Sequence, residues 1–208
     1  MLWLLAAAFA LAWPIASVAL PADFRQQAPS AEARQVADWV LDSQDHAGLP
    51  FVIVDKVQSR VFVFDGKGAL RGAAPALVGL ATGDESVPGI GQRPVASIRP
   101  EERTTPAGRF VASLERSLHG DEILWVDYDA GIALHPVVVV PSERRLQRLA
   151  SPSASEHRIT YGCINVPVAF FRKVVAPLFR AGPGVVYVLP ERRPARELFG
   201  ANVRARTP

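Results

Sequence analysis

One cysteine and four histidines are the residues of this 208-residue chain best suited to covalent chemistry. With no second cysteine to pair with, Cys163 is a buried apolar side chain, an intermolecular bridge or a reactive thiol. A thiol with an ordinary pKa of about 8.5 is mostly protonated at neutral pH, so a nucleophilic cysteine needs a base or a positive neighbour. All four histidines precede Cys163, whereas papain-like enzymes place their histidine after the cysteine. This order argues against a papain-like hydrolase.

The surroundings of Cys163 and His135 favour a reactive thiol. Gly162 comes directly before the cysteine and permits close approach to the main chain, where the N–H of Cys163 can face a developing oxyanion. His135 ends the apolar run Ile132–Leu134, so its ring should project from the rigid end of a strand. We therefore expect His135 to be the base and Cys163 the nucleophile.

The other three histidines lie in less suitable places. His157 belongs to a polar segment and is expected to be a solvated loop residue, while His46 and His119 lie beside turns and are given no role. A zinc site can be drawn from His119, Asp121, His135 and Cys163, but its spacing matches no zinc pattern. No G-x-S-x-G segment indicates a serine hydrolase. We expect neither a metal nor a cofactor.

The elements that must position these groups are mainly strands. Residues 51–57 and 61–65 predict a β-hairpin, closed by the turn at 66–68. Further strands are expected at 76–80, 109–114, 123–128, 132–135 and 184–189. Helices are expected from Ser30, as a cap, to about 44, and at 142–149 and 167–179. The predicted fold is mainly β and largely antiparallel, with flanking helices.

The long connection at 83–106 has no helical or strand periodicity. It is rich in Gly and Pro, and a structureless stretch of this length in a compact domain is usually functional or disordered. We therefore expect a mobile lid over the site.

The ends of the chain indicate export. Residues 1–20 form an apolar run without a charged side chain, and small residues at 17–19 suit cleavage, so 1–19 is expected to be a signal peptide or an N-terminal membrane anchor. The expected location is the periplasm or cell envelope. A linker and amphipathic helix (20–48), a catalytic domain (49–190) and a basic tail (191–208) follow. The net charge of +3 is small and scattered, which argues against nucleic acid, and we expect a monomer.

Thr160-Tyr161-Gly162-Cys163-Ile164-Asn165 resembles the signature of the L,D-transpeptidase (YkuD-type) catalytic family, in which a histidine precedes [S/T]-H-G-C-hydrophobic-N. The T-P-x-G-x-F pattern of the same family is matched by Thr105–Phe110, and its opening hairpin by Ile53–Gly66. The resemblance covers residues 51 to about 189. It implies a β-sandwich or barrel with flanking helices.

This resemblance implies a thioester mechanism on the stem peptides of peptidoglycan. Cys163 would attack the carbonyl of the third residue and release D-alanine, with His135 as base and then acid and with Gly162 beside the oxyanion. An amine would then resolve the acyl-enzyme. Hydrolysis of the same bond by an L,D-carboxypeptidase or amidase and a non-catalytic wall-binding domain remain the alternatives. Substrate contacts are expected from Tyr161, Asn165, Arg158 and Thr160.

The chain departs from the family pattern in three ways. Tyr161 replaces the usual histidine before Gly-Cys, which leaves His135 as the base. The gap between His135 and Thr160 is longer and contains an Arg-rich helix. Pro136 follows His135 where Gly or Ser is commoner, and its carbonyl is expected to accept the imidazole N–H.

Overall fold

A computed structural model describes residues 21–200. Its main feature is an eight-stranded sheet in the order β3-β2-β1-β10-β5-β6-β7-β9, with a separate pair formed by β4 and β8. Within the sheet only β1–β10 and β7–β9 pair in parallel. The strands are β1 (Phe51–Asp55), β2 (Arg60–Phe64), β3 (Leu70–Pro75), β4 (Val78–Gly79), β5 (Gly108–Arg116), β6 (Glu122–Asp127), β7 (Ile132–Pro136), β8 (Arg158–Thr160), β9 (Ile164–Val166) and β10 (Gly184–Val188). The mainly β, largely antiparallel prediction is confirmed.

The first hairpin forms where its alternation predicts it. β1 and β2 pair in register from Phe51–Phe64 to Asp55–Arg60, and every residue of β1 is buried. This complete burial arises because both faces of the strand are covered. Val52 and Val54 face one hydrophobic core, whereas Phe51 and Ile53 face another.

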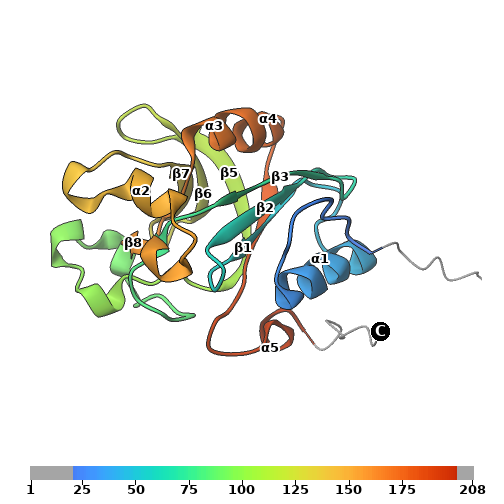
Figure 1. Ribbon diagram of the computed structural model, residues 1–208, viewed down its shortest axis with the longest axis horizontal. Helices are drawn as coiled ribbons and strands as arrows, with labels where there is room; N and C mark the ends of the chain where they lie inside the picture. Colours follow the sequence, from blue (N-terminus) through green and yellow to red (C-terminus); the bar gives the residue numbers. More distant parts are fainter. Residues whose placement is uncertain (1–20, 201–208) are drawn as a thin grey trace, which may run out of the picture.

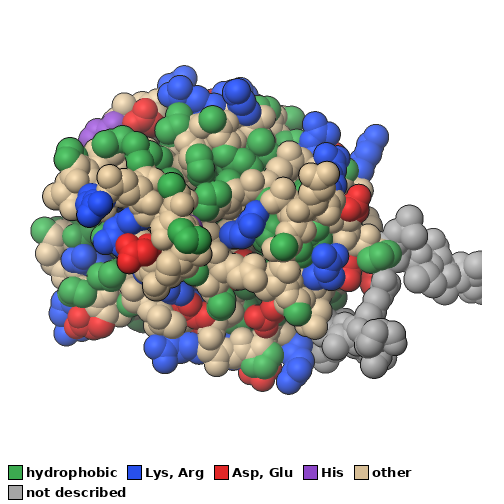
Figure 2. Space-filling model, in the orientation of Figure 1, with side chains coloured by type: hydrophobic (Ala, Val, Ile, Leu, Met, Phe, Trp, Pro, Cys, Tyr) green, Lys and Arg blue, Asp and Glu red, His purple; other side chains and the backbone are tan. Residues whose placement is uncertain are grey.

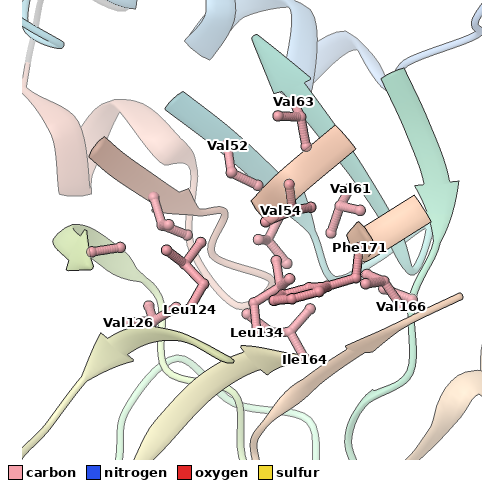
Figure 3. Packing of buried hydrophobic residues seen from close by; sticks show 14 of the residues in the cluster. Val52, Val54, Val61, Val63, Leu124, Val126, Leu134, Ile164, Val166 and Phe171 are labelled. Carbon is pink, nitrogen blue, oxygen red and sulfur yellow. The ribbon is translucent and has the colours of Figure 1, made fainter. Parts of the chain in front are cut away.

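The first core fills the space between the two halves of the bent sheet. Valines of β1 and β2 face Leu124, Leu134 and Ile164 from β6, β7 and β9. In Figure 3 the ring of Phe171 lies among these side chains, between the valines and the pair Leu134 and Ile164. Burial of this apolar surface holds β7 and β9 against the rest of the sheet, and these are the strands that carry the candidate catalytic residues.

The second core lies beneath the helix α1 (Ala31–Ser43). Ser30 caps this helix by accepting a hydrogen bond from the Ala33 N–H at 3.0 Å, as expected, and Val36 and Val40 are buried against the sheet. A short helix in the expected basic tail, α5 (Ala195–Phe199), packs on the same side (Figure 1). Both segments flanking the expected catalytic domain therefore contribute to its core.

The helical segment at 168–179 is interrupted by a π-turn. It comprises α3 (Val168–Phe170), the π-segment η6 (Phe171–Val175) and α4 (Ala176–Phe179). Pro177 has no N–H to bond the carbonyl of Lys173, and this explains a wider turn at that point. The predicted helix 167–179 is thus present, with Pro167 as its N-cap.

The connection at 83–106, expected to be a mobile lid, has local structure and is bonded to the cysteine loop through Thr105, while its mobility stays a prediction. It contains three short 3-10 turns, η1 (Ile90–Gln92), η2 (Val95–Ser97) and η3 (Pro100–Glu102). The carboxylate of Glu102 binds the guanidinium groups of Arg93 and Arg99. Single turns closed by local hydrogen bonds have no apolar periodicity, which is why the sequence shows none.

Other differences concern short elements. Of the strand expected at 76–80 only the two-residue β4 is present, and the strands β3, β8 and β9 were not expected. The predicted helix 142–149 starts as a 3-10 turn, η4 (Pro141–Glu143), and continues as α2 (Arg145–Ala150). A further 3-10 turn, η5 (Ala154–His157), precedes β8. Strands of two or three residues are too short to show alternation.

Charge is mixed on the face shown in Figure 2, where Lys and Arg side chains alternate with acidic and apolar ones. None of the helices within 21–200 is long and apolar enough to cross a membrane. The expected signal peptide or anchor at 1–19 lies outside the described residues.

Candidate active site

Cys163 and His135 line the same cavity, which has a volume of about 550 Å³. The cavity lies over the ends of β7 and β9 and is also bounded by the β5–β6 turn and by the start of the 168–179 helical segment. This volume is within the range of about 300–1,000 Å³ typical of small-molecule sites. The nucleophile and base expected from the sequence thus share one pocket.

The parallel pairing of β7 and β9 accounts for this arrangement. Leu134 pairs with Ile164, and His135 with Asn165. Because successive side chains alternate between faces, Leu134 and Ile164 enter the core while His135 and Asn165 point the other way. Cys163 lies one residue before Ile164, on the same face as Asn165. The pairing therefore places thiol and imidazole on neighbouring strands of one face.

His135 is held by a hydrogen bond at each ring nitrogen. Its Nδ1 lies 2.9 Å from the carbonyl oxygen of Pro136, the main-chain acceptor expected from the sequence. Its Nε2 lies 3.0 Å from Nδ2 of Asn165. Burial lowers the pKa of His135 below its ordinary value of 6.5, and the positive charge of Arg145 lowers it further, against the opposing effects of Pro136 and Asp121. The imidazole is therefore neutral at pH 7.

Cys163 is partly exposed at the cavity and has no disulfide partner. Its Sγ lies 3.7 Å from the carbonyl oxygen of Gly131. Burial raises the pKa of the thiol, while a hydrogen bond from the Ala133 main chain and the charge of Arg145 oppose this effect. The resting pair is thus a neutral thiol and a neutral imidazole, and this state requires the base to take the proton during attack.

The loop before Cys163 is held by two threonines. The hydroxyl of Thr160 lies 2.6 Å from the carbonyl oxygen of Cys163 and 3.1 Å from the N–H of Gly162. The hydroxyl of Thr105 donates to the carbonyl of Gly162 at 2.7 Å and accepts from the Gly79 N–H at 2.9 Å. The T-P-x-G-x-F segment therefore fixes the cysteine loop from behind.

Gly162 has a positional role in this geometry. Its φ of +128° strains other residues, and a Cβ there would lie 2.6 Å from both the Thr104 carbonyl oxygen and Cδ1 of Ile132. The atoms that approach Gly162 closely therefore belong to the protein, not to a substrate as expected from the sequence. Because its N–H is already donated to Thr160, the structure gives Gly162 no free donor for the expected oxyanion role.

The residues expected to contact substrate have partners within the protein. Arg158 pairs with Glu191 and donates to the carbonyls of Gly79 and Ala81, which ties β8 to β4. The guanidinium of Arg103 covers the ring of Tyr161 at 3.9 Å from the ring centre. Together with the bonds of Thr160 and Asn165, these contacts make the four residues supports of the cysteine loop.

Two histidines without a catalytic role are buried. His157 was expected in solvent, but the 154–157 turn directs it inward, where its Nε2 lies 3.1 Å from the Ser151 carbonyl oxygen. His46 contacts the carbonyls of Val40 and Gly66 and lies against Phe51. Neither lines the cavity of Cys163.

The cavity is also lined by residues to which sequence reasoning gave no role. His119 and Asp121, from the β5–β6 turn, lie there with Trp125 and with Arg172 of the π-segment. No group of three or more His, Cys, Asp or Glu side chains within 21–200 is arranged to hold a metal ion. Only the β5–β6 hairpin, a tertiary feature, brings His119 and Asp121 to the cavity of His135.

Comparison with protein-family models finds no match, and comparison with curated proteins finds none either. Among solved structures, the chain is similar to the LD transpeptidase LdtMt1 in complex with imipenem, at 17% identity and a TM-score of 0.39. That match covers 67% of this chain and 58% of the other, so the chain spans less than two thirds of that structure. A likeness at this level does not establish the family.

Proposed function

We infer that this chain is a cysteine acyltransferase that acts on the stem peptides of peptidoglycan, an L,D-transpeptidase with Cys163 as nucleophile and His135 as base. The observation that carries this proposal is the placement of both residues in one cavity, with the Nδ1 of His135 bonded to a main-chain carbonyl. A thiol, a neutral imidazole and an orienting acceptor are the parts of a nucleophilic triad. The family resemblance supplies the substrate class.

In the proposed acylation, Sγ of Cys163 leaves the Gly131 carbonyl and attacks the carbonyl carbon of the third stem residue. Its proton passes to Nε2 of His135, which must first lose its contact with Asn165. The main-chain N–H of Cys163 stabilises the oxyanion, a contribution of roughly 3 kcal/mol per donor. The carbon–nitrogen bond then breaks, His135 returns the proton to the departing D-alanine, and a thioester remains. An amine attacks the thioester and releases the thiol.

The charges at the cavity suit a zwitterionic peptide. Arg172 supplies a cation and Asp121 a carboxylate to the lining of the cavity. Glu122 also lines the cavity, but it is already paired with Arg180 at 2.7 Å. In the proposed complex Arg172 faces a substrate carboxylate and Asp121 faces an amine. An exported enzyme would meet such peptides in the cell envelope.

The test is incubation with muropeptides that carry tetrapeptide stems, followed by mass spectrometry. Cross-linked dimers with loss of D-alanine are the expected products, and they should disappear in Cys163→Ala. If tripeptides form without dimers, the reaction is hydrolysis of the same bond and not transpeptidation. Unchanged muropeptides, together with no covalent adduct between a carbapenem and Cys163, would contradict the proposed chemistry and favour a wall-binding domain.

A further inference from the structure

The side chain of Asn165 has only one orientation that satisfies its neighbours. Its Oδ1 lies 3.0 Å from Nη1 of Arg145, and a guanidinium is only a donor. The carbonyl of the amide must therefore face Arg145, and the NH2 group must face Nε2 of His135 at 3.0 Å. Asn165 is buried, and its backbone N–H and carbonyl both bond Leu77. The amide is thus fixed in position as well as in direction.

This orientation determines which nitrogen of His135 carries the proton. An imidazole nitrogen that accepts a hydrogen bond has no proton, so Nε2 is bare and the proton lies on Nδ1. The Pro136 carbonyl, 2.9 Å from Nδ1, accepts that proton. One tautomer satisfies every group in the chain from Arg145 to Pro136. In this tautomer the lone pair of Nε2 accepts from Asn165, so Nε2 can take a proton from a thiol once that contact opens.

Arg145 is itself held in place. It is the first residue of α2, its side chain is 13% exposed, and its Nε is paired with the carboxylate of Glu143 in the preceding turn. The next arginine of that helix on the same side, Arg148, donates to the Glu143 main-chain carbonyl at 3.0 Å and so closes the turn. The guanidinium therefore meets Asn165 from a rigid corner.

We propose that Arg145 is a positioning residue for the base: through Asn165 it holds His135 as the Nδ1–H tautomer, with Nε2 kept as the proton acceptor. The catalytic importance of that tautomer rests on the proposed function, but the tautomer itself does not. Once Nε2 is protonated, two donors face each other across the Asn165 contact and the charge of Arg145 lies nearby. The imidazolium is therefore disfavoured and should pass its proton on to the leaving amine.

Nitrogen NMR of the histidine-labelled full chain tests this inference without any substrate. His135 should show a protonated Nδ1 and a bare Nε2 in the wild type. In Arg145→Met the Asn165 amide is free to flip, so a mixture of His135 tautomers is expected. The titration midpoint of His135 should also rise, because the carboxylate of Asp121 then acts on the ring without the opposing charge of Arg145. Arg144→Met is the matched control, because Arg144 is exposed and its side chain contacts Gln147 instead.

Asn165→Asp is the sharper variant because it keeps the shape and replaces the donor by an acceptor. A carboxylate there should draw a proton onto Nε2, giving the imidazolium or the other tautomer over a wider pH range. Acylation by a carbapenem should slow by about tenfold or more in both Arg145→Met and Asn165→Asp. Unfolding curves identify any variant that fails to fold, and Asn165→Asp serves in place of Arg145→Met in that case. Arg145→Lys keeps a cationic donor and should retain the wild-type tautomer.

The inference is overturned if Arg145→Met, or Asn165→Asp in its place, retains the wild-type tautomer and titration curve. A wild-type chain that shows the Nδ1–H tautomer but never acylates would contradict the proposed function and leave the positioning intact. The two failures are therefore distinguishable.

Discussion

At the scale of single residues, the neutral state of both Cys163 and His135 predicts the pH dependence of acylation. Burial and Arg145 lower the pKa of His135 below 6.5, so the imidazole becomes protonated, and unable to act as a base, only in more acidic solution. The acid limb of the carbapenem acylation rate should therefore have its midpoint below pH 6.5. In Asp121→Asn the midpoint should fall further, since that carboxylate raises the pKa.

Asp129→Asn is the control for this shift, because Asp129 lies in the next turn and is not among the groups that act on His135. A midpoint above 6.5 would contradict the assignment of His135 as the base.

The lowered pKa of His135 also makes the stability of the fold depend on pH. The unfolded chain binds the proton more readily, so stability is complete above 6.5 and declines as the pH falls toward the folded pKa.

A substitution at Thr105 should lower activity although this side chain is not expected to contact the substrate. Its hydroxyl bonds both Gly162 and Gly79, and Thr105→Val keeps the shape while leaving a buried carbonyl and a buried N–H unsatisfied. We expect a loss of roughly 1–3 kcal/mol of stability and slower acylation, measured by denaturant unfolding and intact mass. Thr82→Val, at an exposed position directly before the 83–106 connection, should change neither. Wild-type acylation in Thr105→Val would show that the cysteine loop needs no such support.

At the scale of elements, Lys56 anchors three separate segments. Its ammonium is fully buried and lies 3.0 Å from Asp84, 2.9 Å from the Thr105 carbonyl oxygen and 3.7 Å from Glu191. Burial lowers its pKa, while the neighbouring carboxylates oppose that effect. The cluster joins the β1–β2 turn, both ends of the 83–106 connection and the segment after β10.

Lys56→Met should therefore destabilise the fold by about 3–5 kcal/mol, because it leaves the buried carboxylate of Asp84 without its cation, while Glu191 keeps Arg158. Hydrogen exchange should show residues 83–106 opening faster than the strands in the variant, but not in the wild type. Lys67→Met, in the exposed turn after β2, is the control and should leave both measurements unchanged. Fast exchange of 83–106 in the wild type would instead support the mobile lid expected from the sequence.

At the scale of the whole molecule, the segments before and after the central sheet form one layer. The ring of Phe199 in α5 stacks on Trp39 of α1 at 5.9 Å between ring centres and meets Tyr187 of β10 edge-on at 5.8 Å. The N–H of Ala195 donates to Glu32 at 2.6 Å. Residues 31–43 and 195–199 thus cover the same face of the sheet, although they are far apart in sequence (Figure 1).

Phe199→Ala should lower the free energy of unfolding by roughly 2 kcal/mol, less than for a fully buried ring because Phe199 is only partly covered. The exposed neighbour Arg196→Ala should have little effect. Acylation should stay unchanged in both, since this layer covers β1, β2 and β10 and shares no residue with the lining of the Cys163 cavity. Equal stability of the two variants would mean that α5 does not contribute to the core.

Local signals in the sequence determined the first hairpin, the helix capped by Ser30 and the mainly β class, because each depends on residues a few positions apart. They also identified Cys163 and His135 and the Pro136 carbonyl as an acceptor. Only the tertiary structure decided that β9 pairs with β7, that Arg145 reaches Asn165, that His157 turns inward and that 83–106 packs behind the cysteine loop. These contacts join distant segments through short strands and side-chain hydrogen bonds, and such pairings have no periodic trace in the sequence.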